Sequence, residues 1–231
     1  MLELKSLTGG YGNVTILRDV SITVPDSSVV ALIGPNGAGK TTTLKMASGV
    51  LRPDAGSVVL DGTDVTKIGS AARSKAGMCH LIEGRGVFPS LTVRENMVLF
   101  SPKGAEADAF EKAASTFPIL GRRRDQVAGT LSGGEQQMLA LARAYVSNPR
   151  LVLVDEASLG LAPLVVDTIF EFLDQLRKEG ISLLIVEQYV SRVLAVANSV
   201  YVLHKGEVVF SGAPSELNEK RLFALYAGEA A

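Results

Sequence analysis

The chain has 231 residues, 47% of which are hydrophobic, and its 23 basic and 24 acidic side chains give a formal net charge of -1. This length fits one globular domain, or one domain with a smaller lobe. The mean hydropathy is +0.26, yet no stretch reaches the roughly 18 uninterrupted apolar residues that a membrane-spanning helix needs. The near-neutral charge argues against a general nucleic-acid binder, because phosphate neutralisation requires an excess of Lys and Arg.

The amino terminus and the cysteine content indicate a reducing compartment. The chain begins Met1-Leu2-Glu3-Leu4-Lys5, with an acid where a signal peptide carries a basic region followed by an apolar run. Its single cysteine, Cys79, cannot form an internal disulfide, and we expect it to fill space as a small apolar residue in a strand. A cytoplasmic protein is therefore expected.

The first segment predicts a β-rich lobe. Apolar and polar residues alternate at 2–4 and at 20–24, which is typical of half-exposed antiparallel strands. Tyr11-Gly12-Asn13 is expected to form a turn between them.

Three apolar runs, at 29–33, 151–154 and 181–186, predict a second sheet. Continuous apolarity over such short runs is typical of parallel strands that are covered on both faces. Each run leads into polar or Gly-rich residues and then a helical pattern, so we expect a doubly wound α/β sheet with ligands at the carboxyl ends of its strands.

The remaining segments predict helices and a hairpin. A helix-rich stretch at about 92–147 interrupts the α/β alternation and is expected to form a helical sub-lobe. Apolar segments at 200–203 and 207–210 flank His204-Lys205-Gly206 and predict a hairpin, after which a short helix is expected around 219–226.

The first strand of the predicted parallel sheet leads into a phosphate-binding motif. It reads Gly34-Pro35-Asn36-Gly37-Ala38-Gly39-Lys40-Thr41, followed by Thr42, and fits G-x-x-x-x-G-K-[ST]. In such a P-loop, backbone N–H groups and the positive end of the next helix attract phosphate. We expect Lys40 to contact the β and γ oxygens and the Thr41 hydroxyl to bind Mg²⁺. The alternative, a Gly-rich strand-to-helix turn, leaves the lysine unexplained.

Two acids end the second apolar run. Asp155 is placed to hold the metal, and Glu156 to direct a water at the γ-phosphate. The alternative is a solvated Asp–Glu pair at a strand end.

A third motif selects among P-loop families. It comprises Leu131, Ser132, Gly133, Gly134 and Glu135 at the start of a helical pattern. Taken alone, the motif is explained by a helix cap. In combination with the P-loop and the two acids, the whole chain resembles the ATP-binding cassette (ABC) family.

This resemblance implies the fold and the partners. It implies an α/β P-loop NTPase cassette over residues 1–231, with a RecA-like core sheet, an N-terminal antiparallel β lobe and the helical sub-lobe. ATP and Mg²⁺ are the implied cofactors, with the motif at 131–135 facing the nucleotide of a second cassette in a head-to-tail heterodimer or homodimer.

Further roles follow from the resemblance. Tyr11 matches the aromatic that stacks on adenine, although packing in a turn is the alternative. The loop at 158–161 matches the one that couples the paired sites. Two positions depart from most cassettes: Glu83 replaces a glutamine near the metal, and Gln188 replaces a histidine that contacts the γ-phosphate. An amide still donates a hydrogen bond, but it cannot become positively charged.

Four motifs together resemble the LivF-type subunits of branched-chain amino acid importers. They are E-G-R-x-V-F-P-S-L-T-V-x-E-N, L-S-G-G-E-Q-Q-M-L-A, D-E-x-S-L-G-L-A-P and V-E-Q. Ala157 departs from this pattern, since relatives usually have proline there. The resemblance implies permease subunits as direct partners, a solute-binding protein as an indirect one, and a peripheral position on the cytoplasmic face of the membrane.

Two alternatives remain open. A cassette for a different solute fits the same motifs, as does a nucleotide-dependent clamp with little turnover, which Glu83 and Gln188 favour. A third reading, a small-molecule kinase, lacks support, because a kinase would share the P-loop but has no use for residues 131–135. We expect permease contacts at Val87, Phe88 and Leu91, with packing inside the helical lobe as the alternative. The Arg122-Arg123-Arg124 run is interpreted as a solvated loop face, so no nucleic-acid partner is expected.

Overall fold

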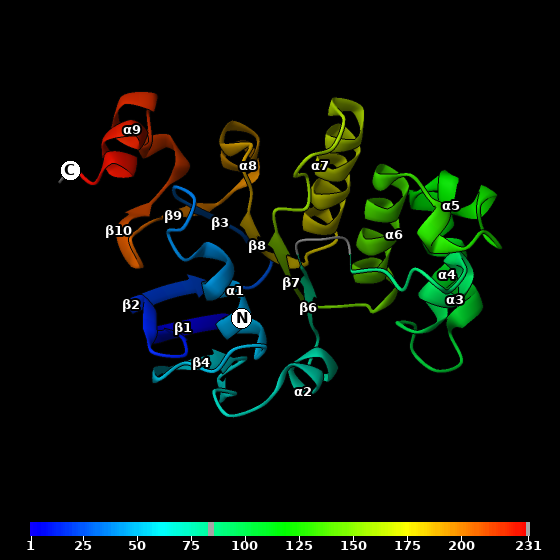
Figure 1. Ribbon diagram of the computed structural model, residues 1–231, viewed down its shortest axis with the longest axis horizontal. Coiled ribbons are helices and arrows are strands. Elements are labelled where there is room, and N and C mark those ends of the chain that lie inside the picture. Colours follow the sequence, from blue (N-terminus) through cyan, green and yellow to red (C-terminus); the bar gives the residue numbers. More distant parts are fainter. Residues whose placement is uncertain (83–85, 230–231) are drawn as a thin grey trace.

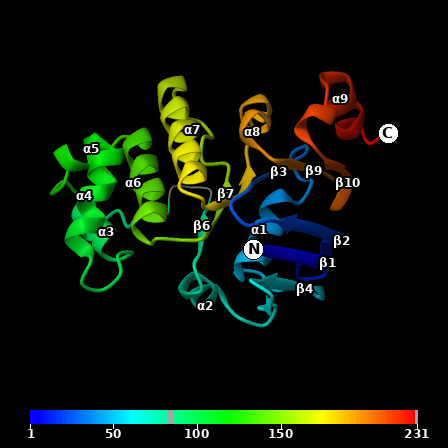
Figure 2. The ribbon, with the colours of Figure 1, turned by 180° about the vertical axis from the view of Figure 1, so that it is seen from behind.

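The computed structural model describes residues 1–82 and 86–229. These residues form two sheets with helices between and above them (Figure 1). Figures 1 and 2 place helices α3 to α5 at one end of the molecule, and strand β10 with helix α9 at the other. None of the described helices is both long and apolar enough to cross a membrane.

The smaller sheet is antiparallel and carries the amino-terminal strands. Its order is β2 (Val14–Val24), β1 (Leu2–Tyr11), β4 (Ala55–Leu60) and β5 (Thr63–Asp64). The predicted antiparallel pair is confirmed as β1 and β2, with Leu4 opposite Ile22. Tyr11 was expected in the turn, but it is the last residue of β1, because it still pairs with Val14 across a tight Gly12-Asn13 connection.

The larger sheet forms the centre of the fold. Its order is β10 (Glu207–Gly212), β9 (Ser199–His204), β3 (Val29–Ile33), β8 (Ser182–Val186), β7 (Leu151–Asp155) and β6 (Met78–Leu81). All neighbours are parallel except the β9–β10 hairpin. The three predicted parallel strands and the predicted hairpin are thus confirmed.

Strand β3 shows why the parallel strands have uninterrupted apolar sequences. Ala31 and Ile33 point into one buried cluster with the covering helices, whereas Val30 and Leu32 point into a second cluster with α1 and the antiparallel sheet. Because both faces of the sheet are covered, alternation of polar and apolar residues disappears. Cys79 is buried in β6 as expected.

The helices cover both faces of the larger sheet. They are α1 (Lys40–Ser48), α2 (Ser70–Lys75), α3 (Val93–Val98), α4 (Glu106–Thr116), α5 (Pro118–Arg122), α6 (Gly133–Val146), α7 (Pro163–Lys178), α8 (Val190–Val196) and α9 (Glu219–Ala227), with 3₁₀ turns at Ala128–Thr130 and Pro214–Glu216. Helices α3 to α6 fill the stretch predicted to be helical, and α9 confirms the predicted terminal helix. Apolar residues of α4 and α6 belong to the same buried cluster as β3 and β7, so the helical part shares its core with the sheet.

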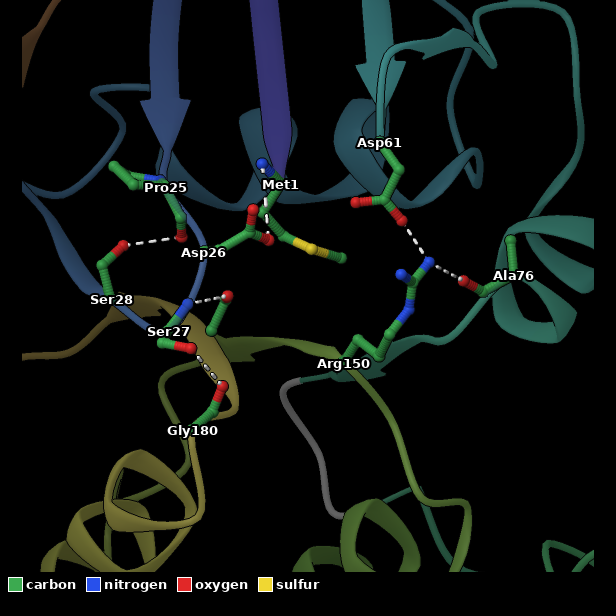
Figure 3. A network of polar contacts seen from close by, with 10 residues as sticks. Met1, Pro25, Asp26, Ser27, Ser28, Asp61, Ala76, Arg150 and Gly180 are labelled. Atoms are coloured by element: carbon green, nitrogen blue, oxygen red, sulfur yellow. Dashed lines mark hydrogen bonds and ion pairs between the residues drawn. The ribbon is translucent and has the colours of Figure 1, made fainter.

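A polar network joins the two sheets at the amino ends of the parallel strands (Figure 3). The backbone N–H of Ser27 donates to the Ser182 hydroxyl at 3.0 Å, and the Ser27 hydroxyl donates to the Gly180 carbonyl at 3.0 Å. The Arg150 guanidinium pairs with the Asp61 carboxylate and donates to the Ala76 carbonyl at 3.4 Å. These contacts fix one edge of the sheet and leave the carboxyl edge for the site described next.

Candidate functional site

A cavity of about 420 Å³ opens at the carboxyl ends of β3, β7 and β8. Its walls come from the P-loop, from the residues after β7 and β8, and from β2. They are Ile16, Asn36, Gly37, Gly39, Lys40, Thr41, Thr42, Glu156, Leu159 and Gln188. Four segments that are distant in sequence therefore meet where a doubly wound sheet places its ligands.

The P-loop owes its shape to glycines. Gly37 and Gly39 adopt left-handed conformations, with φ of 79° and 107°, which cost glycine little. A side chain at Gly39 would meet Leu17 at 2.6 Å, so the loop also lies directly against β2. Gly39 is the residue before α1, and no side chain caps this end of the helix. The first backbone N–H groups of α1 are thus left to face the cavity, which suits an anion.

Lys40 points back into the loop that precedes it. Its ammonium donates to the carbonyls of Gly34 at 3.0 Å and Pro35 at 3.1 Å, and the side chain is buried. Burial lowers the pKa of this lysine, while the nearby charges of Glu156 and Asp155 act in the opposite direction. A lysine that is desolvated and held in this way is well placed to contact phosphate oxygens.

Thr41 and Asp155 lie side by side. The Thr41 hydroxyl donates to a carboxylate oxygen of Asp155 at 3.0 Å, and Asp155 is almost fully buried at the end of β7. Hydroxyl and carboxylate oxygens are ligands that Mg²⁺ prefers, and phosphates and waters usually complete its octahedron. The two side chains therefore fit a Mg²⁺ ion that is shared with a phosphate. No group of three or more His, Cys, Asp or Glu side chains within 1–82 and 86–229 is arranged to hold a metal without such help.

Glu156 has an unusual backbone conformation. Its φ is 46°, in the left-handed region that costs a non-glycine residue free energy. Its N–H donates to the Val186 carbonyl at 2.9 Å, which ties the turn after β7 to the end of β8. The side chain is half-buried and lines the cavity, as a group that orients a water must.

Two residues after β8 have different environments. Gln188 is exposed and lines the cavity, whereas Glu187 is only 3% exposed. The Glu187 carboxylate accepts hydrogen bonds from Ser158 and from the Gln188 backbone. Burial raises the pKa of Glu187 and the charge of Glu156 adds to this effect, while the hydrogen bonds oppose it.

Comparison with known proteins assigns the family. The model of the ABC transporter family matches residues 17–159, more than half of the chain. The chain belongs to the ABC transporter family. It is an ATP-binding subunit and an ATPase of this family, and the walls of the cavity include residues of its P-loop and Glu156.

The similar proteins are named either for branched-chain amino acid transport or for lipopolysaccharide export. The chain is 41% identical to the high-affinity branched-chain amino acid transport ATP-binding protein BraG of Pseudomonas aeruginosa, covering 90% of the chain and 91% of that protein. It is 37% identical to a probable branched-chain amino acid transport ATP-binding protein, LivF, of Archaeoglobus fulgidus, covering 96% of each. The lipopolysaccharide export system ATP-binding protein LptB of Escherichia coli is 33% identical, over 99% of the chain and 97% of that protein.

Solved structures confirm the cassette fold. The ADP conformation of an ATP-binding cassette of an ABC transporter matches with a TM-score of 0.80 at 26% identity, covering 98% of this chain and 94% of the other. An ATP-binding subunit of another ABC transporter matches with a TM-score of 0.84 at 26% identity, covering 100% and 95%. The predicted α/β cassette is thus confirmed.

Other predicted site residues of the ABC subunit lie outside the cavity walls. Tyr11 is 46% exposed at the end of β1, and the Lys45 ammonium lies 5.7 Å from the centre of its ring. Glu83 lies outside the described residues.

The motif at 131–135 caps helix α6. The Ser132 hydroxyl accepts from the Glu135 backbone N–H at 3.3 Å, and the Glu135 carboxylate accepts from the Ser132 N–H at 2.8 Å. The Ser132 backbone N–H is the main cause of the lowered pKa of Glu135, and Arg123 contributes less. Within this ABC subunit the motif therefore has the structural role of a helix cap, and its residues are not among the walls of the cavity.

Sequence reasoning missed the roles of two residues of this region. Ile16 lines the cavity, as does Leu159 of the 158–161 loop that the sequence singled out, and Glu187 supports the cavity from behind. Ile16 lies in an ordinary alternating strand, so no sequence signal separates it from its neighbours. Glu187 had a usable signal, since a carboxylate directly after a fully buried strand at the carboxyl edge of a sheet is an unusual position for a charge.

Proposed function

We propose that this ABC ATPase powers the import of branched-chain or related amino acids. The observation that carries the proposal is the 41% and 37% identity to transport ATP-binding proteins for such amino acids, over nine-tenths or more of each chain. The V-E-Q sequence at 186–188 and the E-G-R sequence at 83–85 support the same subtype. Lipopolysaccharide export is the second candidate, because LptB relatives are 33% identical over nearly the whole chain.

The cavity suggests a role for each wall. We assign Lys40 and the amides of 34–42 to the phosphates of ATP, with Thr41 and Asp155 holding Mg²⁺. Bound Mg²⁺ would neutralise charge on the β- and γ-phosphates. Glu156 orients a water and accepts its proton as the oxygen attacks the γ-phosphorus in line, and ADP leaves.

The amide of Gln188 is assigned to the γ-phosphate. It lines the cavity on the side of β8, and its N–H₂ group can donate to a phosphate oxygen. An amide holds this position without a change of charge. Turnover should therefore lack a step that depends on an imidazole.

We propose that residues 1–231 act as one cassette that pairs head to tail with a second one. Ser132 is exposed and starts α6, so its hydroxyl and the first amides of the helix are accessible to the nucleotide of a partner. Leu131, Gly133, Gly134 and Glu135 keep this helix start in place. Tyr11, which is exposed at the end of β1 and lies beside Lys45 of α1, is assigned to the adenine ring.

A surface between α2 and α3 suits a permease. A cavity of about 300 Å³ lies there, with Val50, Ile82 and Phe100 in its walls. Val50 is 59% exposed and nearby Phe88 is 47% exposed, which leaves apolar area for a membrane partner to cover. Of the contacts predicted from sequence, Phe88 is exposed, whereas Val87 packs against the buried cluster. Such docking would hold the subunit peripherally at the cytoplasmic face.

Uptake of labelled leucine, isoleucine and valine by cells that lack the gene tests this function. We expect uptake to be lost, to return with the wild-type gene and to stay absent with Glu156→Gln. Normal uptake in the deletion strain, together with lipopolysaccharide retained in the inner membrane, would instead establish the export function.

A further inference from the structure

Four charged side chains are buried in the described part of the chain, and three of them have an evident role in the cavity or at a helix end. The fourth, Glu187, has partners that suggest neither role. The other buried charged side chains there are Lys40, Asp155 and Arg73. Lys40 lines the cavity, Asp155 accepts from the hydroxyl of the lining residue Thr41, and Arg73 donates to backbone carbonyls around the end of α1. Since a buried carboxylate is costly, its position calls for an explanation.

Three donors surround the Glu187 carboxylate. The Ser158 backbone N–H donates to Oε1 at 3.0 Å, and the Ser158 hydroxyl donates to Oε2 in a short hydrogen bond. The backbone N–H of Gln188 donates to Oε2 at 3.3 Å. Both oxygens are thus engaged, and Ser158 is itself fully buried. The carboxylate therefore links the loop after β7 to the loop after β8.

The linked loops carry the residues assigned to chemistry. Strands β7 and β8 end level with one another, with Asp155 opposite Val186. Beyond that point the chains separate, and the Glu187–Ser158 contact is the next tie between them. Glu156 lies between the two ties, because its own N–H is bound to Val186 and Ser158 follows two residues later.

Each member of the contact adjoins a cavity wall. Ser158 precedes Leu159, and Glu187 precedes Gln188, and both of these neighbours line the cavity. A displacement of the 158–161 loop would therefore move the Gln188 segment through a single carboxylate. A carboxylate suits this task better than an amide, because it accepts from three donors at once.

We propose that Glu187 is a positioning residue that couples the 158–161 loop to Gln188 and fixes Glu156 between them. The inference rests on the roles proposed for Glu156 and Gln188. It predicts that the contact serves turnover rather than ATP affinity, since its atoms face the loops and not the phosphates. A movement of the 158–161 loop would thereby change the position of Gln188, and with it the contact to the γ-phosphate.

Steady-state ATP hydrolysis by the transporter complex tests the coupling. Removing the link should misplace Glu156 and Gln188, and such a misplacement costs on the order of 10–100-fold in rate. We expect Glu187→Ala to lower kcat by about that factor, and Ser158→Ala, which keeps its backbone N–H donor, to lower it measurably but less, with KM for ATP changed less than about 3-fold in both. Glu187→Gln should lose less, because its amide oxygen still accepts from the Ser158 N–H. The double variant should lose little more than Glu187→Ala alone, since that variant already removes both hydrogen bonds to Ser158.

The controls separate positioning from general damage. Glu171→Gln replaces an exposed carboxylate on α7 and should leave kcat and KM unchanged. If Glu187→Ala does not fold, Ser158→Ala decides, because it removes one hydroxyl and keeps the backbone hydrogen bond. Unchanged kcat in Ser158→Ala, or fully multiplicative losses in the double variant, would overturn the proposal.

Glu156→Gln distinguishes a failure of the proposed catalytic roles from a failure of the proposed coupling. If Glu156→Gln turns over ATP at the wild-type rate, the proposed catalytic roles fail. If it is inactive while Glu187→Ala and Ser158→Ala are fully active, only the coupling fails.

Discussion

The ammonium of Lys40 is held by the two carbonyls of Gly34 and Pro35, inside the loop that it serves. We expect Lys40→Ala to weaken binding of a fluorescent ATP analogue by at least about 10-fold, because a charge-assisted contact to phosphate is lost. Lys67→Ala is a matched control, since Lys67 is exposed and lies outside the cavity. Equal affinities of the wild type and Lys40→Ala would contradict the assigned role.

Gln188 allows the switch position to be examined directly. Gln188→Ala should lower turnover, because the cavity loses a hydrogen-bond donor to the γ-phosphate. Gln188→His should keep turnover and acquire a pH dependence near neutrality, because an imidazole titrates there. The measurement is kcat between pH 5.5 and about 8.5 for the three proteins. A wild-type rate in Gln188→Ala would remove the residue from the mechanism.

Residues of the site differ in how far sequence could identify them. The P-loop, Asp155 and Glu156 are contiguous motifs whose chemistry depends on spacing along the chain. The structure brings P-loop residues and Glu156 into one cavity, with Asp155 beside Thr41. The contact of Glu187 with Ser158 joins residues 29 positions apart, and only the pairing of β7 with β8 makes it visible. Sequence thus singled out the groups that we assign to phosphate and missed the group behind them.

At the scale of elements, Arg73 of α2 holds the carboxyl end of α1. Its guanidinium donates to the carbonyls of Met46 at 2.8 Å and Ala47 at 2.6 Å, and also to Ile68 and Val65. A cation at the carboxyl end of a helix donates hydrogen bonds to carbonyls that have no partner within the helix, and it interacts favourably with the helix dipole. Burial lowers the pKa of Arg73, and the charge of Asp64 partly offsets this.

We expect Arg73→Met to lower the free energy of unfolding by about 2–4 kcal/mol, because several buried carbonyls lose a charged donor. Urea unfolding followed by circular dichroism measures this. Arg52→Met should have little effect, since Arg52 is exposed. If Arg73→Met lowers the free energy of unfolding no more than Arg52→Met does, water replaces the guanidinium without cost.

His80 makes β6 and α1 sensitive to acid. Burial lowers the pKa of His80 to about 4, with the charges of Arg143 and Lys45 adding to the effect, and its Nδ1 lies 3.0 Å from the Ser48 hydroxyl. Between pH 6.5 and 4 the unfolded chain binds a proton at this position that the folded chain does not. The free energy of unfolding therefore falls with decreasing pH across this window, by up to about 3 kcal/mol.

His80→Asn should reduce that pH dependence, because asparagine keeps a polar group near Ser48 and does not titrate. Urea unfolding at several pH values between 4 and 7 measures the slope. An unchanged slope in His80→Asn would assign the acid sensitivity to other groups.

Elements with strong local signals were predicted best. The short apolar runs are typical of strands buried on both faces, and the hairpin at 204–206 contains a glycine in its turn. Strands β4 and β5 were not predicted, because β4 begins with Ala55 and Gly56 and β5 has only two residues. Both depend on pairing with a strand that is already in place.

At the scale of the molecule, the antiparallel sheet, the P-loop and the β9–β10 hairpin form one support for the cavity. The Gly206 N–H donates to the Ala38 carbonyl at 2.9 Å, and the Arg18 N–H donates to the Gly206 carbonyl at 2.8 Å. Residues from three parts of the chain thus hold the P-loop from behind. No local sequence motif predicts these contacts, because they form only when the two sheets are assembled.

The left-handed backbone of Glu156 has a consequence for the whole molecule. This residue has a φ of 46° and a negative charge close to the buried Glu187, and both features oppose folding. Glu156→Gln removes the repulsion, and Glu156→Gly also removes a backbone strain of about 1 kcal/mol. We expect both variants to melt above the wild type by about 2–4 °C per kcal/mol gained, with Glu171→Gln unchanged as a control. Lower melting temperatures in both would show that the native contacts of this side chain outweigh its strain. The more stable variants would then be inactive as ATPases. Selection for transport would in that case keep the wild-type chain below the stability that its fold can reach.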